Sequence, residues 1–255
     1  MRKLVLISVM SAMLLTLLTI SGAFAGNGTA TLSGPLFSIQ ATTASGLLGS
    51  VDIPNPWGPN LVDTASWVLD HDINITAGDI VIGKLTAFQY SIASAADPTA
   101  MLIFAVQAGS SDTTFNFSSG PVSFSTITNG MAYASAGVTL TGDSNGATIT
   151  GLFGGKCYQA RYNASNTVFT NLVNSFSTPV DSTSTASERN PVAGRVQIAG
   201  AVDSIQSQFN FTLSANDTAS GTSRFDIIPI PEPGSLLALG GGLIGLIGFN
   251  VRRKR

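Results

Sequence analysis

The chain contains one histidine, His71, and one cysteine, Cys157, among 255 residues. With one residue of each kind, zinc sites and nucleophile triads built on histidine are nearly excluded. A single cysteine also excludes an internal disulfide, so stability has to come from a sufficient core. We interpret Cys157 as a buried small hydrophobe rather than a reactive thiol.

Basic residues are scarce between residues 26 and 229, where six lysines and arginines stand against thirteen acidic residues. Nucleic acid phosphates require a basic surface, so an acidic segment of this kind excludes nucleic acid as the partner. Cations, neutral glycans or other proteins suit this composition better.

Helical periodicity is absent from the same segment, and so is any repeat of constant period, which argues against solenoids and propellers. Short runs of β-branched and aromatic residues recur instead, separated by clusters of Gly, Pro, Asn, Asp and Ser. About 200 residues suit one large all-β domain better than two small ones. The sequence therefore predicts a single antiparallel β-sandwich, jelly-roll-like, over residues 26–229.

Turn residues predict two hairpins, one at residues 113–124 and one at residues 137–150. The loop of the second contains Asn145-Gly146, a pair that tolerates the positive φ values of tight turns. Residues 208–213 predict a third strand pair, which continues through a polar loop at 215–221 into a closing strand at 224–228.

Other strands are predicted at residues 66–69, 73–76, 80–85, 88–93, 101–107, 168–173 and 196–199. The Ser- and Thr-rich residues 177–191 are predicted to form a long exposed loop.

The N-terminus reads as a secretory signal peptide over residues 1–25. Two cations, Arg2 and Lys3, precede an apolar run over residues 4–20, and the small residues Ala23 and Ala25 form a cleavage site. We expect export by the Sec route and cleavage by signal peptidase after Ala25. The alternative is a permanent N-terminal membrane helix; either way the following residues lie outside the cytoplasm.

The C-terminus, residues 230–255, has three parts in a fixed order. Pro231, Glu232 and Pro233 form an extended segment, because proline fixes φ and removes backbone donors. An apolar stretch of about 24 Å as a helix follows over residues 236–251, and we expect it to cross the membrane. The chain ends with four cations that would stay on the cytoplasmic side: Arg252, Arg253, Lys254 and Arg255.

This order of parts resembles the PEP-CTERM sorting signal, which is read by the processing enzyme exosortase. The resemblance covers residues 231–255 and implies cleavage near Pro231 to Pro233. It further implies an intermediate anchored in the inner membrane, release or attachment at the cell surface, and a link to exopolysaccharide production.

The only histidine lies between two acidic residues, in Asp70-His71-Asp72. We interpret it as part of a solvated turn or strand end, because nothing marks a partner nucleophile. Four residues of this region form an irregular candidate site for calcium, which prefers oxygen ligands: Asp70, Asp72, Asn74 and Asp79. The turn glycine and the bidentate glutamate of an EF-hand are missing, so solvated loop charge is the competing interpretation. No other cofactor is expected.

The two tryptophans stand in different settings. Trp67 lies in an apolar run and is predicted to be in the core. Trp57 lies in a stiff loop with prolines on both sides, where its ring would either offer a platform to a sugar or cap the end of the sandwich.

The sequence therefore predicts an exported, exosortase-sorted protein of the cell surface or extracellular matrix, non-enzymatic and structural, associated with exopolysaccharide or biofilm. One alternative is a carbohydrate-binding β-sandwich that uses Trp57 and calcium. A second is a secreted hydrolase, for which no constellation of residues speaks.

Overall fold

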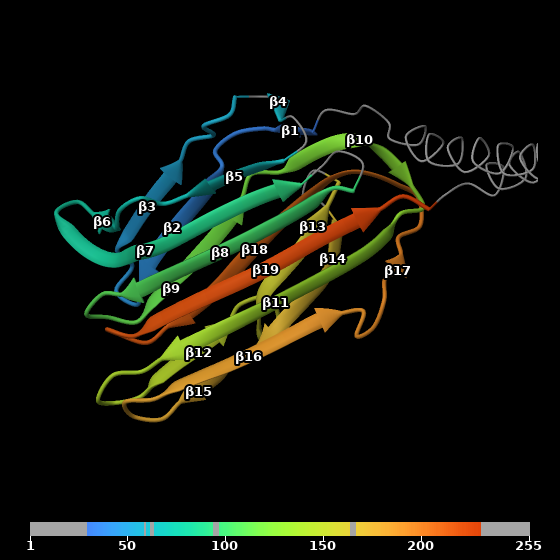
Figure 1. The fold of residues 1–255 in the computed structure, drawn as a ribbon. Helices are drawn as coiled ribbons and strands as arrows, with labels where there is room; N and C mark the ends of the chain where they lie inside the picture. The colour runs from blue at the N-terminus through green and yellow to red at the C-terminus, as the bar shows by residue number, and fades with distance from the viewer. Residues whose placement is uncertain (1–29, 59, 62–63, 94–96, 164–166, 231–255) are drawn as a thin grey trace, which may run out of the picture.

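The computed structural model describes five segments of the chain, residues 30–58, 60–61, 64–93, 97–163 and 167–230. Every regular element in these segments is a β-strand (Figure 1). None of the described residues belongs to a helix that is long and apolar enough to cross a membrane. The predicted signal peptide and the predicted sorting tail from Pro231 onward lie outside the described residues.

The strands are β1 (Ala30–Leu32), β2 (Phe37–Thr43), β3 (Leu48–Ile53), β4 (Asn60–Leu61), β5 (Ala65–Val68), β6 (Ile73–Ala77), β7 (Ile80–Ala93), β8 (Thr99–Ala108), β9 (Thr113–Ser119), β10 (Val122–Thr128), β11 (Met131–Thr141), β12 (Ala147–Gly151), β13 (Lys156–Tyr162), β14 (Thr167–Asn174), β15 (Phe176–Thr178), β16 (Thr183–Asn190), β17 (Val196–Gln197), β18 (Ala201–Leu213) and β19 (Thr218–Ile228).

These strands form two antiparallel sheets. The larger, sheet A, has 11 strands in the order β3-β2-β9-β18-β10-β1-β4, and β12 to β15 join it through the other edge of β18. The smaller, sheet B, has 8 strands in the order β16-β11-β19-β8-β7-β5, with β17 beside β11 and β6 beside β7. The all-β antiparallel prediction is therefore confirmed, whereas the jelly-roll form of the sandwich stays a prediction.

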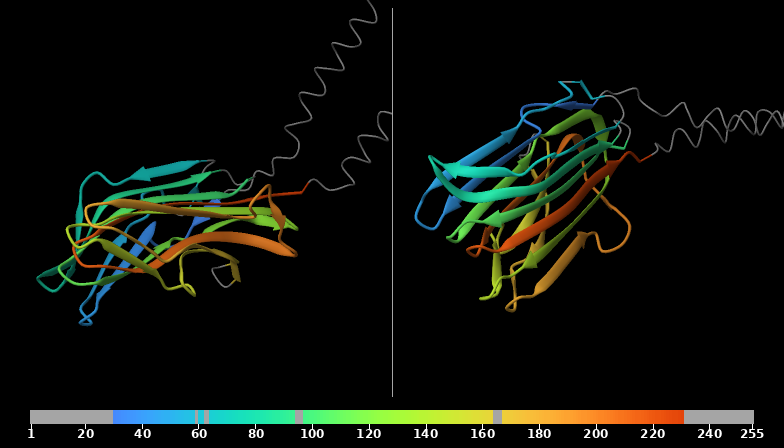
Figure 2. Two further views of the ribbon diagram at one scale, coloured as in Figure 1. Left: turned by 90° about the horizontal axis from the view of Figure 1, so that it is seen from below. Right: turned by 60° about the vertical axis from the view of Figure 1, so that its left-hand side comes forward.

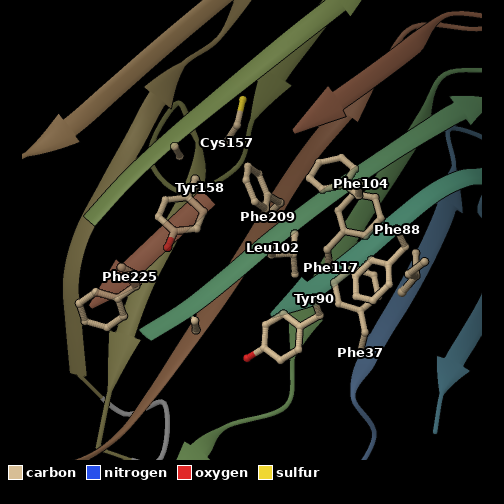
Figure 3. Close-up of a cluster of buried hydrophobic side chains, with 14 of the residues drawn as sticks. Phe37, Phe88, Tyr90, Leu102, Phe104, Phe117, Cys157, Tyr158, Phe209 and Phe225 are labelled. Atoms are coloured by element: carbon tan, nitrogen blue, oxygen red, sulfur yellow. The ribbon is translucent and has the colours of Figure 1, made fainter. Parts of the chain in front are cut away.

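The two sheets lie face to face as a sandwich (Figure 2). Aromatic rings from both sheets meet in one core (Figure 3). Phe37 of sheet A lies 4.1 Å from Phe88 of sheet B, centroid to centroid. Phe104 of sheet B lies 4.5 Å from Phe117 and 4.8 Å from Phe209, both of sheet A. Tilted, stacked and edge-on pairs at these separations stabilise the core beyond the apolar area that the rings bury.

Strand β18 is central in sheet A and pairs with four other strands, β9, β10, β12 and β13. These pairings show that the predicted hairpin at residues 113–124 is wrong. β9 pairs with residues 208–213 of β18, and β10 pairs with residues 201–205 along the same edge. The two strands therefore continue one another in line. Gly120 between them serves a close approach, because an added Cβ would lie 2.5 Å from the carbonyl oxygen of Pro35.

The predicted hairpin at residues 137–150 is also wrong, although its turn is real. Gly146 has φ 81°, and its N–H donates to the Asp143 carbonyl over 3.1 Å. However, β11 lies in sheet B and β12 in sheet A, so this turn carries the chain from one sheet to the other. Turn chemistry fixes the reversal of the chain but not the partner of the next strand.

The predicted exposed loop at residues 177–191 contains strand β16, which pairs along its whole length with β11. Its side chains alternate between exposed and half-buried positions. As an edge strand it needs few large apolar residues, and for this reason its small polar sequence resembles a loop.

The remaining predicted strands coincide with observed ones. Residues 80–85 and 88–93 belong to one strand, β7, which has a register shift between Leu85 and Ala87. The closing strand begins earlier than predicted, at Thr218, and Phe209, Phe211 and Leu213 do share the buried face of β18.

Candidate functional site

The side chain of His71 lies in the solvated turn between β5 and β6. Its Nδ1 is 2.5 Å from Oδ1 of Asp70, and the two side chains are 73% and 83% exposed. An ion pair in full solvent is screened and contributes little. This environment agrees with the interpretation of His71 as a solvated turn residue.

The four candidate calcium ligands lie along one edge of sheet B. Asp72 forms an ion pair with Lys84 of β7, and Asn74 stands opposite Lys84 in the β6–β7 register. Asp79 lies in the turn that follows β6. Within the described segments no group of three His, Cys, Asp or Glu residues could hold a metal ion. Lys84 pairs with the Asp72 carboxylate that would be a calcium ligand. The calcium site stays a prediction.

Trp57 is half-buried and packs against the hydrophobic core. The Asn55 side chain shapes its turn, because it accepts from the Trp57 N–H over 3.0 Å and donates to the Gly58 carbonyl over 2.6 Å. This position resembles the end cap of a sandwich more than a projecting platform, and a glycan contact by Trp57 stays a prediction. Trp67 is likewise half-buried against the core, 5.8 Å from Phe88.

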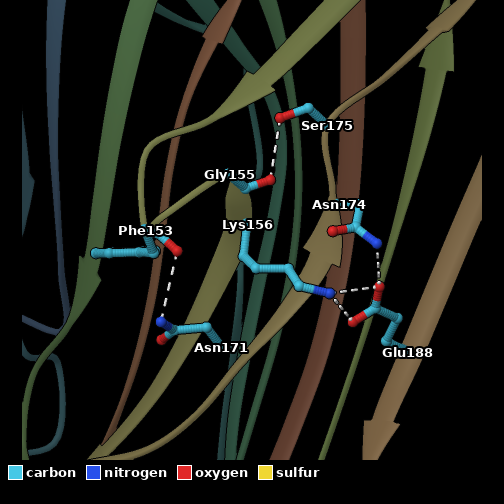
Figure 4. Close-up of polar contacts among 7 residues, drawn as sticks. All are labelled: Phe153, Gly155, Lys156, Asn171, Asn174, Ser175 and Glu188. Atoms are coloured by element: carbon cyan, nitrogen blue, oxygen red, sulfur yellow. Dashed lines mark hydrogen bonds and ion pairs between the residues drawn. The ribbon is translucent and has the colours of Figure 1, made fainter.

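A clasp of polar side chains joins the two sheets at one edge, and sequence reasoning missed it (Figure 4). Lys156 of β13 donates to both carboxylate oxygens of Glu188 of β16, over 2.8 and 2.7 Å, and Asn174 of β14 donates to the same carboxylate over 3.1 Å. Desolvation opposes the charged form of Glu188, but the Lys156 hydrogen bond and charge, with backbone bonds from Val173 and Asn174, outweigh it and lower the pKa.

Next to the clasp, Cys157 is buried and free, as the sequence predicted. Burial, reinforced by the Glu188 charge, raises the pKa of its thiol to about 12. At neutral pH this cysteine is therefore not a thiolate nucleophile.

The outer face of sheet A carries amide side chains that bind one another. Gln206 donates to the Ser119 carbonyl over 2.6 Å, Gln159 donates to Asn171 over 2.9 Å, and Arg161 donates to Gln208 over 3.3 Å. Gln206 and Gln159 are only 7% and 9% exposed. The network is incomplete, because Nε of Arg161 and Oδ1 of Asn210 in the same sheet are buried without a hydrogen-bond partner among the described residues.

The outer face of sheet B is broad, and its side chains form rows across the strands. In one row Ser187, Gly137, Thr222 and Ile103 stand in register on β16, β11, β19 and β8. The next row contains Arg189, Ser135, Arg224 and Met101 on the same four strands. Because the residues in the middle of this face are a glycine and residues with short hydroxyl side chains, the surface there is recessed relative to the arginines on either side.

An open groove of about 580 Å³ crosses these two rows. We call it the Gly137 groove, and its lining includes Ser135, Gly137, Ser187, Arg189, Thr222 and Arg224. With Met101 of β8, the lining residues come from four strands and are separated by up to 123 positions in the sequence, so only the register brings them together.

The groove contains two arginines, Arg189 and Arg224, and the buried carboxylate of Asp226 orients one of them, Arg224. Asp226 is 1% exposed and accepts from Nε of Arg224 over 2.9 Å. It also accepts from Nε and Nη2 of Arg195, over 3.0 and 2.5 Å. Arg189 has no polar partner among the described residues. The groove therefore presents guanidinium groups that the fold does not neutralise completely.

Comparison with known proteins identifies one segment. The model of the PEP-CTERM protein-sorting motif matches residues 229–254, which confirms the resemblance seen in the tail. The motif indicates an exported protein that exosortase sorts. The comparison with curated proteins gives no match.

Solved structures resemble the body only distantly. The family 11 carbohydrate-binding module from Clostridium thermocellum is 11% identical, with 76% of this chain and 98% of that one covered and a TM-score of 0.21. The adhesin domain of Epf from Streptococcus pyogenes is 9% identical, with 81% and 65% covered and a TM-score of 0.30. The C-terminal family 6 module of LamC from Zobellia galactanivorans is 10% identical, with 61% and 98% covered and a TM-score of 0.21.

Proposed function

We propose that this chain is a non-enzymatic component of the cell surface or extracellular matrix, with a structural role in association with exopolysaccharide or biofilm. The observation that carries the proposal is the sorting motif at residues 229–254. In this proposal the Sec route exports the chain, signal peptidase removes residues 1–25, and the apolar tail holds an intermediate in the inner membrane until exosortase acts.

The described residues support a role without catalysis. The only histidine is a solvated turn residue next to Asp70, and the only cysteine is buried with a raised pKa. Neither environment activates a nucleophile. The extensive features of the surface are instead two sheet faces covered by hydroxyl, amide and guanidinium groups, which suit adhesion to a hydrated polymer.

The test is to express the chain in a bacterium with and without exosortase and to measure the intact mass of the surface or secreted form. The proposal expects loss of the segment after Pro231 to Pro233 only in the strain that has the enzyme. An intact Arg255 in both strains would leave an anchored envelope protein and remove the link to exopolysaccharide.

A carbohydrate-binding module is the second candidate, and the hydroxyl rows on the outer face of sheet B favour it. A glycan array with the purified full-length chain tests it. Loss of binding in Trp57→Ala, but not in Trp67→Phe, would assign the contact to the proline-rich loop. Loss of binding on chelation of calcium would revive the site at Asp70, Asp72, Asn74 and Asp79.

A further inference from the structure

Positive charge is concentrated at one place on an otherwise acidic body. Of the six basic residues between residues 26 and 229, three lie at the Gly137 groove or beside it: Arg189, Arg195 and Arg224. Asp226 is the carboxylate that pairs with two of them, and Glu188, which also lines the groove, is paired with Lys156. The groove therefore has a local excess of two positive charges, and this combination calls for an anionic ligand.

The two arginines that line the groove are set for two anionic groups on one ligand. Arg189 and Arg224 stand on either side of Ser135 in the same row. Two strand spacings of ~4.8 Å place their Cα atoms about 10 Å apart. Asp226 holds Arg224 through Nε, which leaves its two Nη groups for a bidentate contact with a carboxylate or sulfate.

Between the arginines and in the adjoining row, the surface suits a polyhydroxylated chain. Ser135, Ser187 and Thr222 present hydroxyl groups that both donate and accept. Gly137 has no side chain, so a ligand can lie directly on the sheet. Met101, 41% exposed, is the one large apolar residue of the lining. A protein partner would need an apolar centre with aromatic anchors, which this groove lacks.

We infer that the Gly137 groove binds an anionic polysaccharide, whose carboxylate or sulfate groups pair with Arg189 and Arg224 while its hydroxyl groups contact the serine and threonine floor. The groove is open to solvent and crosses four strands, which suits a linear polymer better than a small enclosed ligand. The inference rests on the proposed association with exopolysaccharide, and it supplies the charge class of the polymer and the residues that recognise it.

Binding of defined polymers to the purified full-length chain in non-ionic detergent tests the inference. Polygalacturonate supplies carboxylates with hydroxyls, dextran sulfate supplies sulfates, dextran supplies hydroxyls alone, and polyglutamate supplies carboxylates alone. We expect binding to polygalacturonate or dextran sulfate that exceeds binding to dextran and polyglutamate. We also expect it to weaken when ionic strength is raised from ~0.05 to ~0.5 M, because exposed arginines are screened.

Four substitutions localise the site. Arg189→Gln is the cleanest, since Arg189 has no polar partner among the described residues, and we expect it to lower the affinity about tenfold. Arg224→Gln should have a similar effect. Gly137→Leu fills the groove without a change in charge. Lys84→Gln is the matched control, because it removes one cation from the same sheet outside the groove.

Equal loss in Lys84→Gln and Arg189→Gln would overturn the inference in favour of general electrostatics. Binding as tight to polyglutamate would overturn it in favour of an acidic protein, and binding as tight to dextran would do so in favour of a neutral glycan. Each of these results leaves the intact-mass test of sorting untouched, so a failure of the groove and a failure of the proposed function can be told apart.

Discussion

Gly221 offers a sharp test of the packing, because it is buried on β19 and an added Cβ would meet the ring of Phe104. It stands opposite Phe104 in the β19–β8 register. A Cβ added to Gly221 would lie 2.5 Å from Cζ of Phe104 and nearer still to Cε1. The Phe104 ring cannot retreat, since Phe117 and Phe209 of sheet A hold it at 4.5 and 4.8 Å.

We expect Gly221→Ala to lower the free energy of unfolding by about 2 kcal/mol. Overpacking a close-packed core costs ~1–3 kcal/mol, and the ring contact places this site at the upper end. The lower backbone entropy of alanine in the unfolded chain offsets ~0.5–1 kcal/mol. Backbone strain adds nothing, because Gly221 does not have a positive φ.

Gly137→Ala is the matched control on the neighbouring strand. Its added Cβ would face solvent and meet Oγ1 of Thr222 at 3.5 Å and Cβ of Ser187 at 3.7 Å, both ordinary contacts. This substitution should leave the free energy of unfolding unchanged or raise it by ~0.5 kcal/mol. The two substitutions differ in environment, because Gly221 faces the core and Gly137 faces solvent.

The assay is urea unfolding of the full-length chain, followed by the fluorescence of Trp57 and Trp67, which both pack against the core. Phe104→Ala alone should lower the free energy of unfolding by ~3–5 kcal/mol. In that background Gly221→Ala should lower it no further, which corresponds to a coupling energy of about 2 kcal/mol between the two substitutions. The reasoning is refuted if Gly221→Ala and Gly137→Ala have the same urea midpoint. It is also refuted if Gly221→Ala lowers the free energy of unfolding by the same amount in the Phe104→Ala background.

Two predictions concern the clasp and its neighbour. Because the folded state lowers the pKa of Glu188, its stabilising contribution is fully present above the ordinary carboxyl pKa and is lost as the pH falls through the lowered one. Glu188→Gln should therefore lower the free energy of unfolding by about 1 kcal/mol at pH 7 and should flatten the acid limb of a pH series of urea midpoints. Cys157, with a pKa of about 12, should resist iodoacetamide in the native protein and react once urea unfolds it, which intact mass measures. Rapid alkylation without denaturant would contradict its buried position.

The sequence predicts many of the strands and few of their partners, and it gives no strand at β2, β3, β13 or β16. Alternation in residues 208–213 is enough to place Phe209 and Phe211 on one face. Gly120 and Gly146 carry the same signal, a glycine between two β runs, yet one lies within a continuing line of strands and the other between the sheets. The two differ in backbone conformation, because Gly146 has φ 81° and Gly120 has no positive φ. Gly120 instead accommodates the carbonyl of Pro35, 85 residues away, a contact that no local pattern contains.

The candidate groove could not be predicted from the sequence either, because it also depends on contacts between residues far apart in the chain. Arg189, Ser135 and Arg224 form a row only because β16 and β19 both pair with β11 in a fixed register. A shift of one residue in either pairing would turn an arginine toward the core. The one local signal is Arg224 two positions before Asp226, since a charged pair at this spacing shares one face of a strand.

Period-two alternation lets one strand serve the core and the groove independently. In β11 the residues between the groove positions, Ala134, Ala136 and Val138, are buried, while Ser135 and Gly137 face outward. Core packing resists changes of a single methylene, whereas exposed positions of a paired strand tolerate most side chains. The outer face of sheet B can therefore change its ligand without loss of the fold. It follows that Arg189→Gln should alter polymer binding with no shift in the urea midpoint, and Gly221→Ala should shift the midpoint with no change in binding.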